Sequence, residues 1–286
     1  MYYECKGKDG RFMESLKPIK RSQVRIYFGT KYYRMRRCID WYFGNTKYAL
    51  TKAEDLLQHV VFQHRSLLLR ELKDCDMWLQ HNKVINLKVA TKVLNKIIIR
   101  PGETFSYWRL LGKTTKKKGY VEGMVLHYGK VKTGIGGGIC QLSNLIYWMA
   151  IHTPLTVTQR YRHSYDVFPD SNRTQPFGSG ATCAYNYLDL QIKNETTNTY
   201  QLIVYLTDTH LVGEWRSDAP ALRTYEVYEK EHAITLEMWG GYVRHNKIHR
   251  KVFNIQHKQI DDEFITENHA IMMYEPMLSA PKVENE

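Results

Sequence analysis

The 286-residue chain lacks any stretch that approaches the roughly 18 consecutive apolar residues of a membrane-spanning helix. Its first ten residues also lack the apolar core of a secretory signal. The sequence contains no repeats and no low-complexity tracts, and a hydrophobic content of 43% is typical of a globular protein. We therefore expect a folded, cytoplasmic protein without a membrane span.

Cysteines are few, and their spacing does not pair them. The five are an odd number and lie far apart: Cys5, Cys38, Cys75, Cys140 and Cys183. This pattern argues against both a disulfide framework and a zinc knuckle, and it predicts thiols that stay reduced. The sequence predicts no metal site and no cofactor.

Acidic residues are scarce relative to basic ones, and the net charge is +12. The first fifty residues contain twelve Lys or Arg and four Asp or Glu, so +8 of the charge lies there. Residues 17–37 mix this charge with tyrosines and would attract an anionic membrane surface, which predicts attachment at the inner membrane face. A solvated basic face is the alternative. No nucleic-acid-binding motif is present, so nucleic acid is not an expected partner. The sequence does not indicate an oligomeric state.

The most informative segment is residues 134–148, where a glycine-rich turn precedes a helix that is predicted to begin at Cys140. Gly136, Gly137 and Gly138 permit backbone angles that a Cβ forbids, so the main-chain N–H groups can point in one direction. A thiol at a helix N-terminus lies at the positive end of the helix dipole, which favours the nucleophilic thiolate. Cys140 is therefore a candidate nucleophile. The alternative is a buried cysteine with a packing role.

The same turn is also a candidate binding site for an anion such as a carboxylate or phosphate. It is not a Walker A loop, because no Gly-Lys-Ser/Thr follows, and Ile139 stands where a dinucleotide fingerprint needs its third glycine. The candidate ligand-binding residues are Gly136, Gly137, Gly138, Gln141 and Ser143.

A catalytic thiolate needs a base and often a third group that orients the base. His163 follows Cys140 by 23 residues, a spacing that can place a strand beside the helix N-terminus. Asp166 or Asp189 could orient the imidazole. Asp189 is the more attractive, since it lies among apolar residues where an unpaired carboxylate would be costly. Two other histidines are alternatives as the base, His152 and His127.

The hydrophobic pattern predicts an α+β fold, with N-terminal helices packed on a mostly antiparallel sheet and the central helix beginning at Cys140. Residues 51–96 repeat their apolar positions every 3.6 residues, which predicts helix. Alternating patterns predict strands over 121–131, 161–168 and 182–193, and further short strands after Pro220. We divide the chain into a basic N-terminal helical region (1–95), a core domain (96–216) and a β-rich C-terminal extension (217–286).

Three motifs of this chain resemble the VanW family. They are Gly-Gly-Gly-Ile-Cys-Gln-Leu-Ser-Asn-Leu at 136–145, Arg-Pro-Gly-Glu-Thr-Phe-Ser at 100–106, and His-Ser-Tyr-Asp-Val at 163–167 with Gly-Ala-Thr at 180–182. The resemblance implies an accessory role in glycopeptide resistance or cell-wall metabolism. Many family members have a second histidine two positions before the one that matches His163. Here that position is Tyr161, so a two-histidine site is not expected.

Two functional hypotheses follow. In the first, Cys140 attacks an acyl carbon with His163 as base, as an amidase or acyl transferase acting on peptidoglycan-related peptides. In the second, the protein is a non-catalytic module whose glycine turn binds an anionic cell-wall precursor.

Overall fold

The computed structural model describes residues 21–69, 76–127, 130–167 and 175–276. These residues form several helices and mostly antiparallel sheets, which confirms the predicted α+β class. The helices and one 3-10 turn are α1 (Gln23–Phe43), α2 (Met77–Leu94), α3 (Tyr107–Leu111), η1 (Lys116–Lys118) and α4 (Cys140–Ala150). None of the helices in these ranges is long and apolar enough to cross a membrane.

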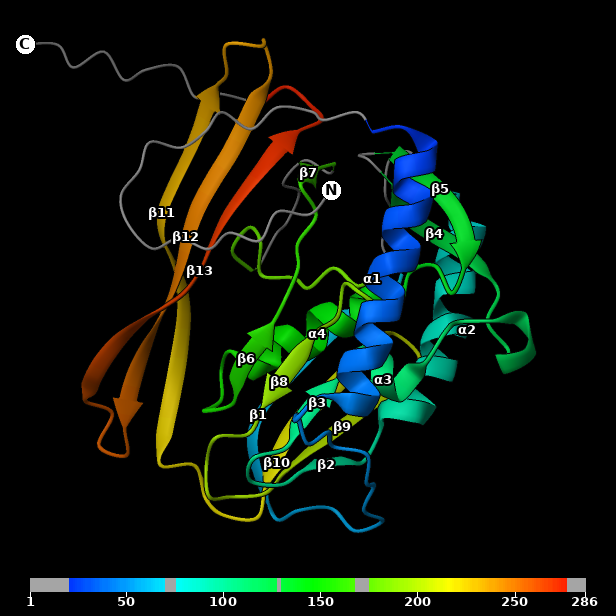
Figure 1. Cartoon of the computed structure of the whole chain (residues 1–286). Coiled ribbons are helices and arrows are strands. Elements are labelled where there is room, and N and C mark those ends of the chain that lie inside the picture. Colours follow the sequence, from blue (N-terminus) through cyan, green and yellow to red (C-terminus); the bar gives the residue numbers. More distant parts are fainter. Residues whose placement is uncertain (1–20, 70–75, 128–129, 168–174, 277–286) are drawn as a thin grey trace, which may run out of the picture.

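The core is built on an antiparallel sheet with strand order β1-β10-β9-β2 (Figure 1). Its strands are β1 (His59–Leu67), β10 (His210–Ser217), β9 (Tyr200–Leu206) and β2 (Ile97–Ile99). Helix α4 packs on β1 and β10, and α2 packs on β9. Gly213 of β10 leaves room for the Met149 side chain of α4. A Cβ added to Gly213 would lie only 2.8 Å from the Met149 sulfur, which is too close. This close approach fixes α4, and with it the N-terminal end of α4, on the sheet.

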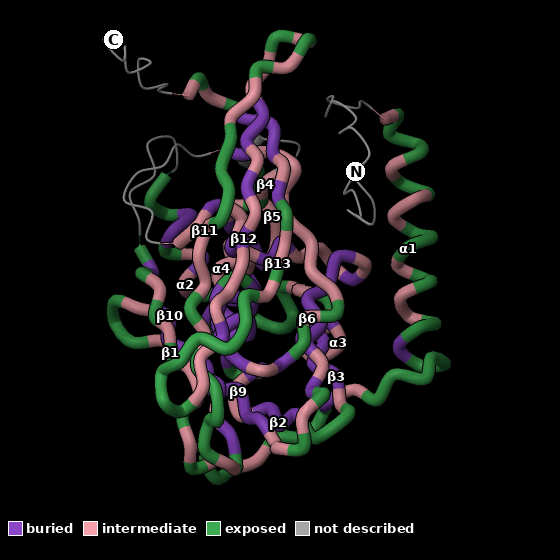
Figure 2. Tube along the Cα trace, turned by 90° about the vertical axis from the view of Figure 1, so that its left-hand side faces the viewer, coloured by how far each residue is buried: buried purple, intermediate pink, exposed green. Residues whose placement is uncertain are grey.

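A second sheet contains three long antiparallel strands and one very short strand. These are β11 (Arg223–Leu236), β12 (Tyr242–Asn254), β13 (Gln259–Met272) and β7 (Tyr165–Asp166), which runs parallel to β13. Figure 2 shows exposed stretches along β11, whereas the C-terminal end of β13 is buried. The prediction of short strands here was wrong. Bulges such as the one between Glu229 and Glu231 interrupt the alternating pattern without ending the strand.

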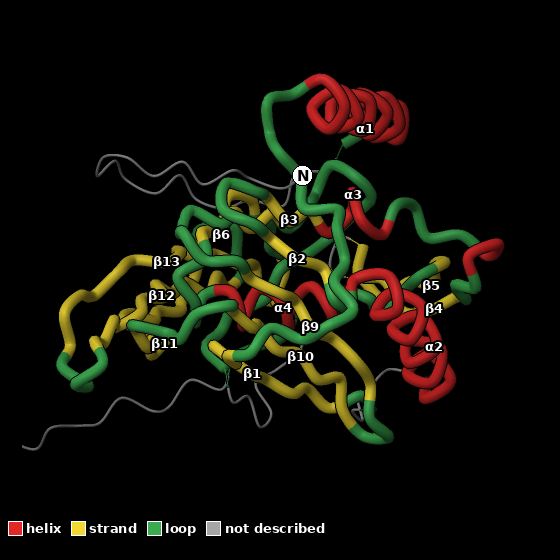
Figure 3. The backbone as a smooth tube through the Cα atoms, turned by 90° about the horizontal axis from the view of Figure 1, so that it is seen from below, coloured by secondary structure: helices red, strands yellow, loops and turns green. Residues whose placement is uncertain are grey.

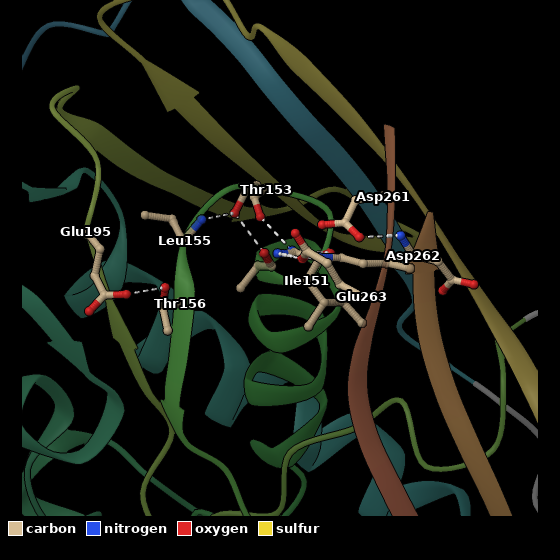
Figure 4. Close-up of polar contacts among 10 residues, drawn as sticks. Ile151, Thr153, Leu155, Thr156, Glu195, Asp261, Asp262 and Glu263 are labelled. Atoms are coloured by element: carbon tan, nitrogen blue, oxygen red, sulfur yellow. Dashed lines mark hydrogen bonds and ion pairs between the residues drawn. The ribbon is translucent and has the colours of Figure 1, made fainter. Parts of the chain in front are cut away.

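Arg250 of β12 joins the second sheet to the end of α4. Its Nη1 donates to the carbonyls of Ile151 at 3.0 Å and Thr153 at 2.8 Å, and its Nε donates to Glu263 of β13 at 2.7 Å. Figure 4 shows Ile151 and Thr153 facing Glu263. A guanidinium at a helix C-terminus is favoured because it complements the negative end of the helix dipole.

A small sheet and a hairpin complete the fold. The sheet contains β3 (Thr104–Ser106), β8 (Gln191–Lys193) and β6 (Thr156–Gln159), and the hairpin contains β4 (Glu122–His127) and β5 (Lys130–Ile135). The sequence predicts one strand over 121–131 that leads into the glycine turn. The structure instead has two strands, and β5 is the one that enters the turn.

The prediction of helix across residues 51–96 was right only for its second half. Residues His59–Leu67 form strand β1, and the helix in this region is α2. The segment that includes Val60, Val61 and Phe62 is rich in residues that favour strands and pairs with β10 along its whole length. Long-range pairing therefore overrides a local helical period.

The predicted strands over 161–168 and 182–193 were mostly wrong, because among the described residues of these two segments only Tyr165–Asp166 and Gln191–Lys193 form strands in sheets. In the second segment, the side chain of Asp189 accepts hydrogen bonds from α3 and its neighbours instead of lying in a regular ladder. Buried polar residues in a loop can produce the same alternation of burial as a strand.

Candidate active site at the start of helix α4

The turn between β5 and α4 requires glycine at three consecutive positions. Gly136 and Gly138 have φ angles of +79° and +86°, in the left-handed region that favours glycine. A Cβ on Gly137 would overlap the backbone of Gly123 in β4. The turn can therefore approach the hairpin only because it has no side chains.

Two fully buried side chains from other elements hold this turn. Asn86 of α2 donates from Nδ2 to the carbonyls of Gly137 at 2.9 Å and Val121 at 3.1 Å, and its Oδ1 accepts from the Val121 amide at 2.8 Å. The hydroxyl of Tyr107 donates to the carbonyl of Ile139 at 3.0 Å. We did not predict either residue from the sequence. The available signal was the polar Asn86 on the apolar face of the predicted helix.

Cys140 is the first residue of α4, as predicted, and the residue as a whole is partly exposed although its thiol is desolvated. The Sγ atom lies 4.0 Å from the carbonyl oxygen of Cys183. Among the described residues, the amides of Gly138, Ile139 and Cys140 donate to no backbone carbonyl. The thiol therefore lies beside N–H groups that can stabilise a negative charge.

Burial raises the pKa of the Cys140 thiol above its ordinary value, although its own amide and the Cys183 backbone act in the opposite direction. Burial also raises the pKa of Cys183, well above the ordinary value, and proximity to Cys140 adds to the effect. The sequence predicts that the helix N-terminus lowers the pKa of Cys140, but desolvation of the thiolate raises this pKa by more. Cys140 is a thiol near neutral pH, so it needs a base to become a nucleophile.

Polar residues of α4 hold the neighbouring segments in place. The Ser143 hydroxyl donates to the Ala181 carbonyl at 2.7 Å, and Gln141 Nε2 donates to Ser66 Oγ at 3.0 Å and to the Leu67 carbonyl at 2.7 Å. Of the residues predicted to bind a ligand, Gln141 and Ser143 therefore form hydrogen bonds within the protein. Gly136, Gly137 and Gly138 shape the turn itself.

His163 lies in a different place from Cys140. No hydrogen bond joins the two side chains in the described structure. Burial, and secondly the Arg162 guanidinium, lower the pKa of His163 to about 4. The imidazole is therefore neutral near pH 7 and can accept a proton.

His163 lines a cleft of about 690 Å³ between the β6 region and β13. Helix α4 contributes Tyr147 to the cleft, seven residues after Cys140. Seven residues of α-helix span about 10 Å. Tyr147 and Cys140 are therefore about 10 Å apart along the axis of α4.

The two candidate aspartates form hydrogen bonds in different parts of the molecule. Asp189 is fully buried and accepts from Ser106 Oγ at 2.5 Å, the Trp108 amide at 2.9 Å and Gln191 Nε2 at 3.2 Å. Asp166 accepts from Tyr274 at 2.9 Å and from Arg244 at 3.4 Å. Among the described residues, neither aspartate accepts a hydrogen bond from His163. Asp189 supports the start of α3, and Asp166 joins β7 to Arg244 of β12 within the second sheet.

The alternative base His152 lies beyond the opposite end of α4 from Cys140. Its Nδ1 is 2.8 Å from the Trp148 carbonyl, and its ring stacks on Phe62 with centroids 4.1 Å apart. The side chain of His127 lies outside the described part of the structure. In the described ranges, no three His, Cys, Asp or Glu side chains come together in a group that could hold a metal ion.

Comparison with known proteins agrees with the motifs around Cys140. The family model described as VanW like protein matches residues 82–216, which include the turn, α4 and His163. The Vancomycin B-type resistance protein VanW of Enterococcus faecalis (strain ATCC 700802 / V583) is 37% identical over 235 residues, which cover 82% of each chain. The uncharacterized protein YoaR of Bacillus subtilis (strain 168) is 27% identical over 141 residues, 49% of this chain and 44% of that protein. No solved structure matches. The chain belongs to the VanW family.

Proposed function

We propose that the protein acts in glycopeptide resistance or cell-wall metabolism as a cysteine-dependent acyl transferase or amidase on peptidoglycan-related peptides. The observation that carries this proposal is the partly exposed Cys140 at the start of α4, beside three amides without backbone acceptors. The name of the enterococcal relative, a resistance protein, supports the biological setting.

In the proposed reaction, the Cys140 proton passes to a base while Sγ forms a bond to the carbonyl carbon of a peptide. The carbonyl oxygen becomes an oxyanion, which the amides at the start of α4 stabilise. The C–N bond then breaks, the departing amine receives the proton, and a thioester remains on Cys140. An amine attacks the thioester in a transferase, and water attacks it in an amidase.

His163 is the proposed base because its imidazole is neutral near pH 7, and in this role its pKa must rise from about 4 when the substrate binds, since burial weakens the base in the free chain. In this role it must approach Cys140 when the substrate binds, because the two are not hydrogen-bonded in the free chain. Catalytic hydrogen bonds often tighten only in the substrate complex. The orienting group in this proposal is Asp166 or Asp189, each of which accepts hydrogen bonds from other residues in the free chain.

The experiment is incubation with a synthetic peptidoglycan stem pentapeptide and an amine acceptor, followed by mass spectrometry of the protein and products. We expect a thioester on Cys140 and a transferred or hydrolysed peptide. Cys140→Ala should abolish both and leave the melting temperature nearly unchanged, while Cys183→Ala serves as the matched control and retains product. If Cys140→Ala retains product, or if its melting temperature drops and the wild type forms no thioester, the catalytic proposal fails.

A second candidate is a non-catalytic module that binds an anionic cell-wall precursor at the turn. It is favoured by one observation, that burial raises the pKa of Cys140 and no base contacts the thiol. Calorimetric titration with the pentapeptide distinguishes the two candidates. Binding that Cys140→Ala leaves intact, without any covalent product, supports the module.

A further inference from the structure

Helix α1 turns its apolar face away from the protein. Five apolar or aromatic residues recur at intervals of three or four along one side of the helix and are 50–65% exposed: Val24, Phe28, Tyr32, Met35 and Ile39. Residues at this spacing lie on one face of a helix. We call this set the outer face of α1. Figure 3 shows α1 nearly end-on at the edge of the body, and Figure 2 shows that one side of the helix is free of other elements along its length.

The inner side of α1 is largely polar, which is the reverse of an ordinary surface helix. Arg34 donates from Nε to the carbonyl of Tyr185 at 2.9 Å, and Arg37 donates from Nη2 to Gln159 Oε1 at 2.6 Å. Trp41 is the one buried residue of the helix. A contiguous exposed apolar stripe of this kind marks an interaction surface.

The charges around the outer face favour an anionic partner. Arg25, Lys31 and Arg36 are exposed beside it, and Asp40 is the only acidic residue of α1. Residues 17–37 contain eight basic and no acidic residues, although 17–20 lie outside the described structure. A second copy of α1 would bring like charges together, whereas anionic lipid would neutralise them.

We infer that α1 lies flat on an anionic lipid surface, with its outer face at the boundary between headgroups and acyl chains. Aromatic residues favour this depth, and flanking Arg and Lys reach the phosphates. Each basic residue near such a surface strengthens binding to anionic lipid. The contacts of Arg34 and Arg37 would hold the body of the protein on the aqueous side of the helix.

The test is co-sedimentation of the full chain with vesicles of phosphatidylcholine alone or mixed with phosphatidylglycerol. We expect binding to the anionic vesicles only, and weaker binding at high salt. The triple variant Phe28→Ser, Met35→Ser, Ile39→Ser should lower the partition coefficient at least tenfold. The matched control is Leu222→Ser, Met238→Ser, which changes apolar residues that are 72% and 103% exposed outside α1. The control should bind like the wild type.

Circular dichroism of all proteins verifies that the variants are folded. Equal binding to both kinds of vesicle, or equal binding by the triple variant, would overturn the inference. So would a lipid-free dimer that the triple variant converts to a monomer, since the outer face would then be covered by a second copy.

Discussion

At the scale of single residues, the protein keeps several titratable side chains uncharged by burying them. The thiols of Cys140 and Cys183 have raised pKa values, and His152 and His163 have lowered ones. In each case desolvation is the largest cause. Burial favours the neutral form of both the thiol and the imidazole, so proton transfer from Cys140 to His163 is uphill in the free chain and depends on changes in the substrate complex.

Burial of His152 makes stability depend on pH. Its pKa falls from an ordinary value of 6.5 to about 4 in the folded protein, so the unfolded chain binds more protons between these values. Stability should therefore be fully present above pH 6.5 and decrease as the pH falls toward 4, by roughly 3 kcal/mol for this residue. Urea unfolding of the wild type and of His152→Gln across pH 4–7 measures the effect. An unchanged pH slope in the variant would contradict it.

The glycine turn allows a second prediction at this scale. Gly137→Ala should prevent the native turn from forming, because its Cβ would overlap the Gly123 backbone. Gly29→Ala, in α1, is the matched control. It has no atom within 4 Å of the new Cβ and should stabilise the helix by about 0.5–1 kcal/mol. Thermal unfolding measures both, and a Gly137→Ala protein as stable as the wild type would refute the turn packing described here.

At the scale of elements, α4 is held at both ends by different partners. Asn86 and Tyr107 fix the turn at its start, and Arg250 binds the carbonyls at its end. The two ends therefore have different roles: the first shapes the candidate site, and the second joins the helix to the C-terminal sheet.

Arg250→Met should separate these roles. It keeps much of the apolar stem but removes three charge-assisted hydrogen bonds, with an expected loss of about 2 kcal/mol or more in unfolding free energy. The alkylation rate of Cys140 in the folded protein should stay the same, because the thiol is at the other end of α4. Denaturant unfolding measures the loss of unfolding free energy. Mass-spectrometric mapping of iodoacetamide labelling measures the alkylation rate of Cys140. A changed labelling rate at Cys140 would show that the two ends are coupled.

At the scale of the whole molecule, the sequence predicts the features that are encoded locally. The start of α4 at Cys140 and the α+β class followed from glycine content and apolar spacing. Strand β1 did not, since it depends on pairing with β10 almost 150 residues later. The positions of Asp166 and Asp189 depend in the same way on distant partners, Tyr274 and Ser106. Spacing along the chain gives no distance between such groups.

The contact between Gly123 and Gly137 limits how this site can be altered by protein engineering. A Cβ on Gly123 would lie 2.6 Å from the Gly137 carbonyl oxygen, so each glycine excludes a side chain on the other. Substituting one cannot be compensated by substituting the other with any larger residue. A mutant library aimed at new activity should therefore keep both glycines constant and vary Thr114 and Lys83, which contact the neighbouring turn positions through side-chain atoms.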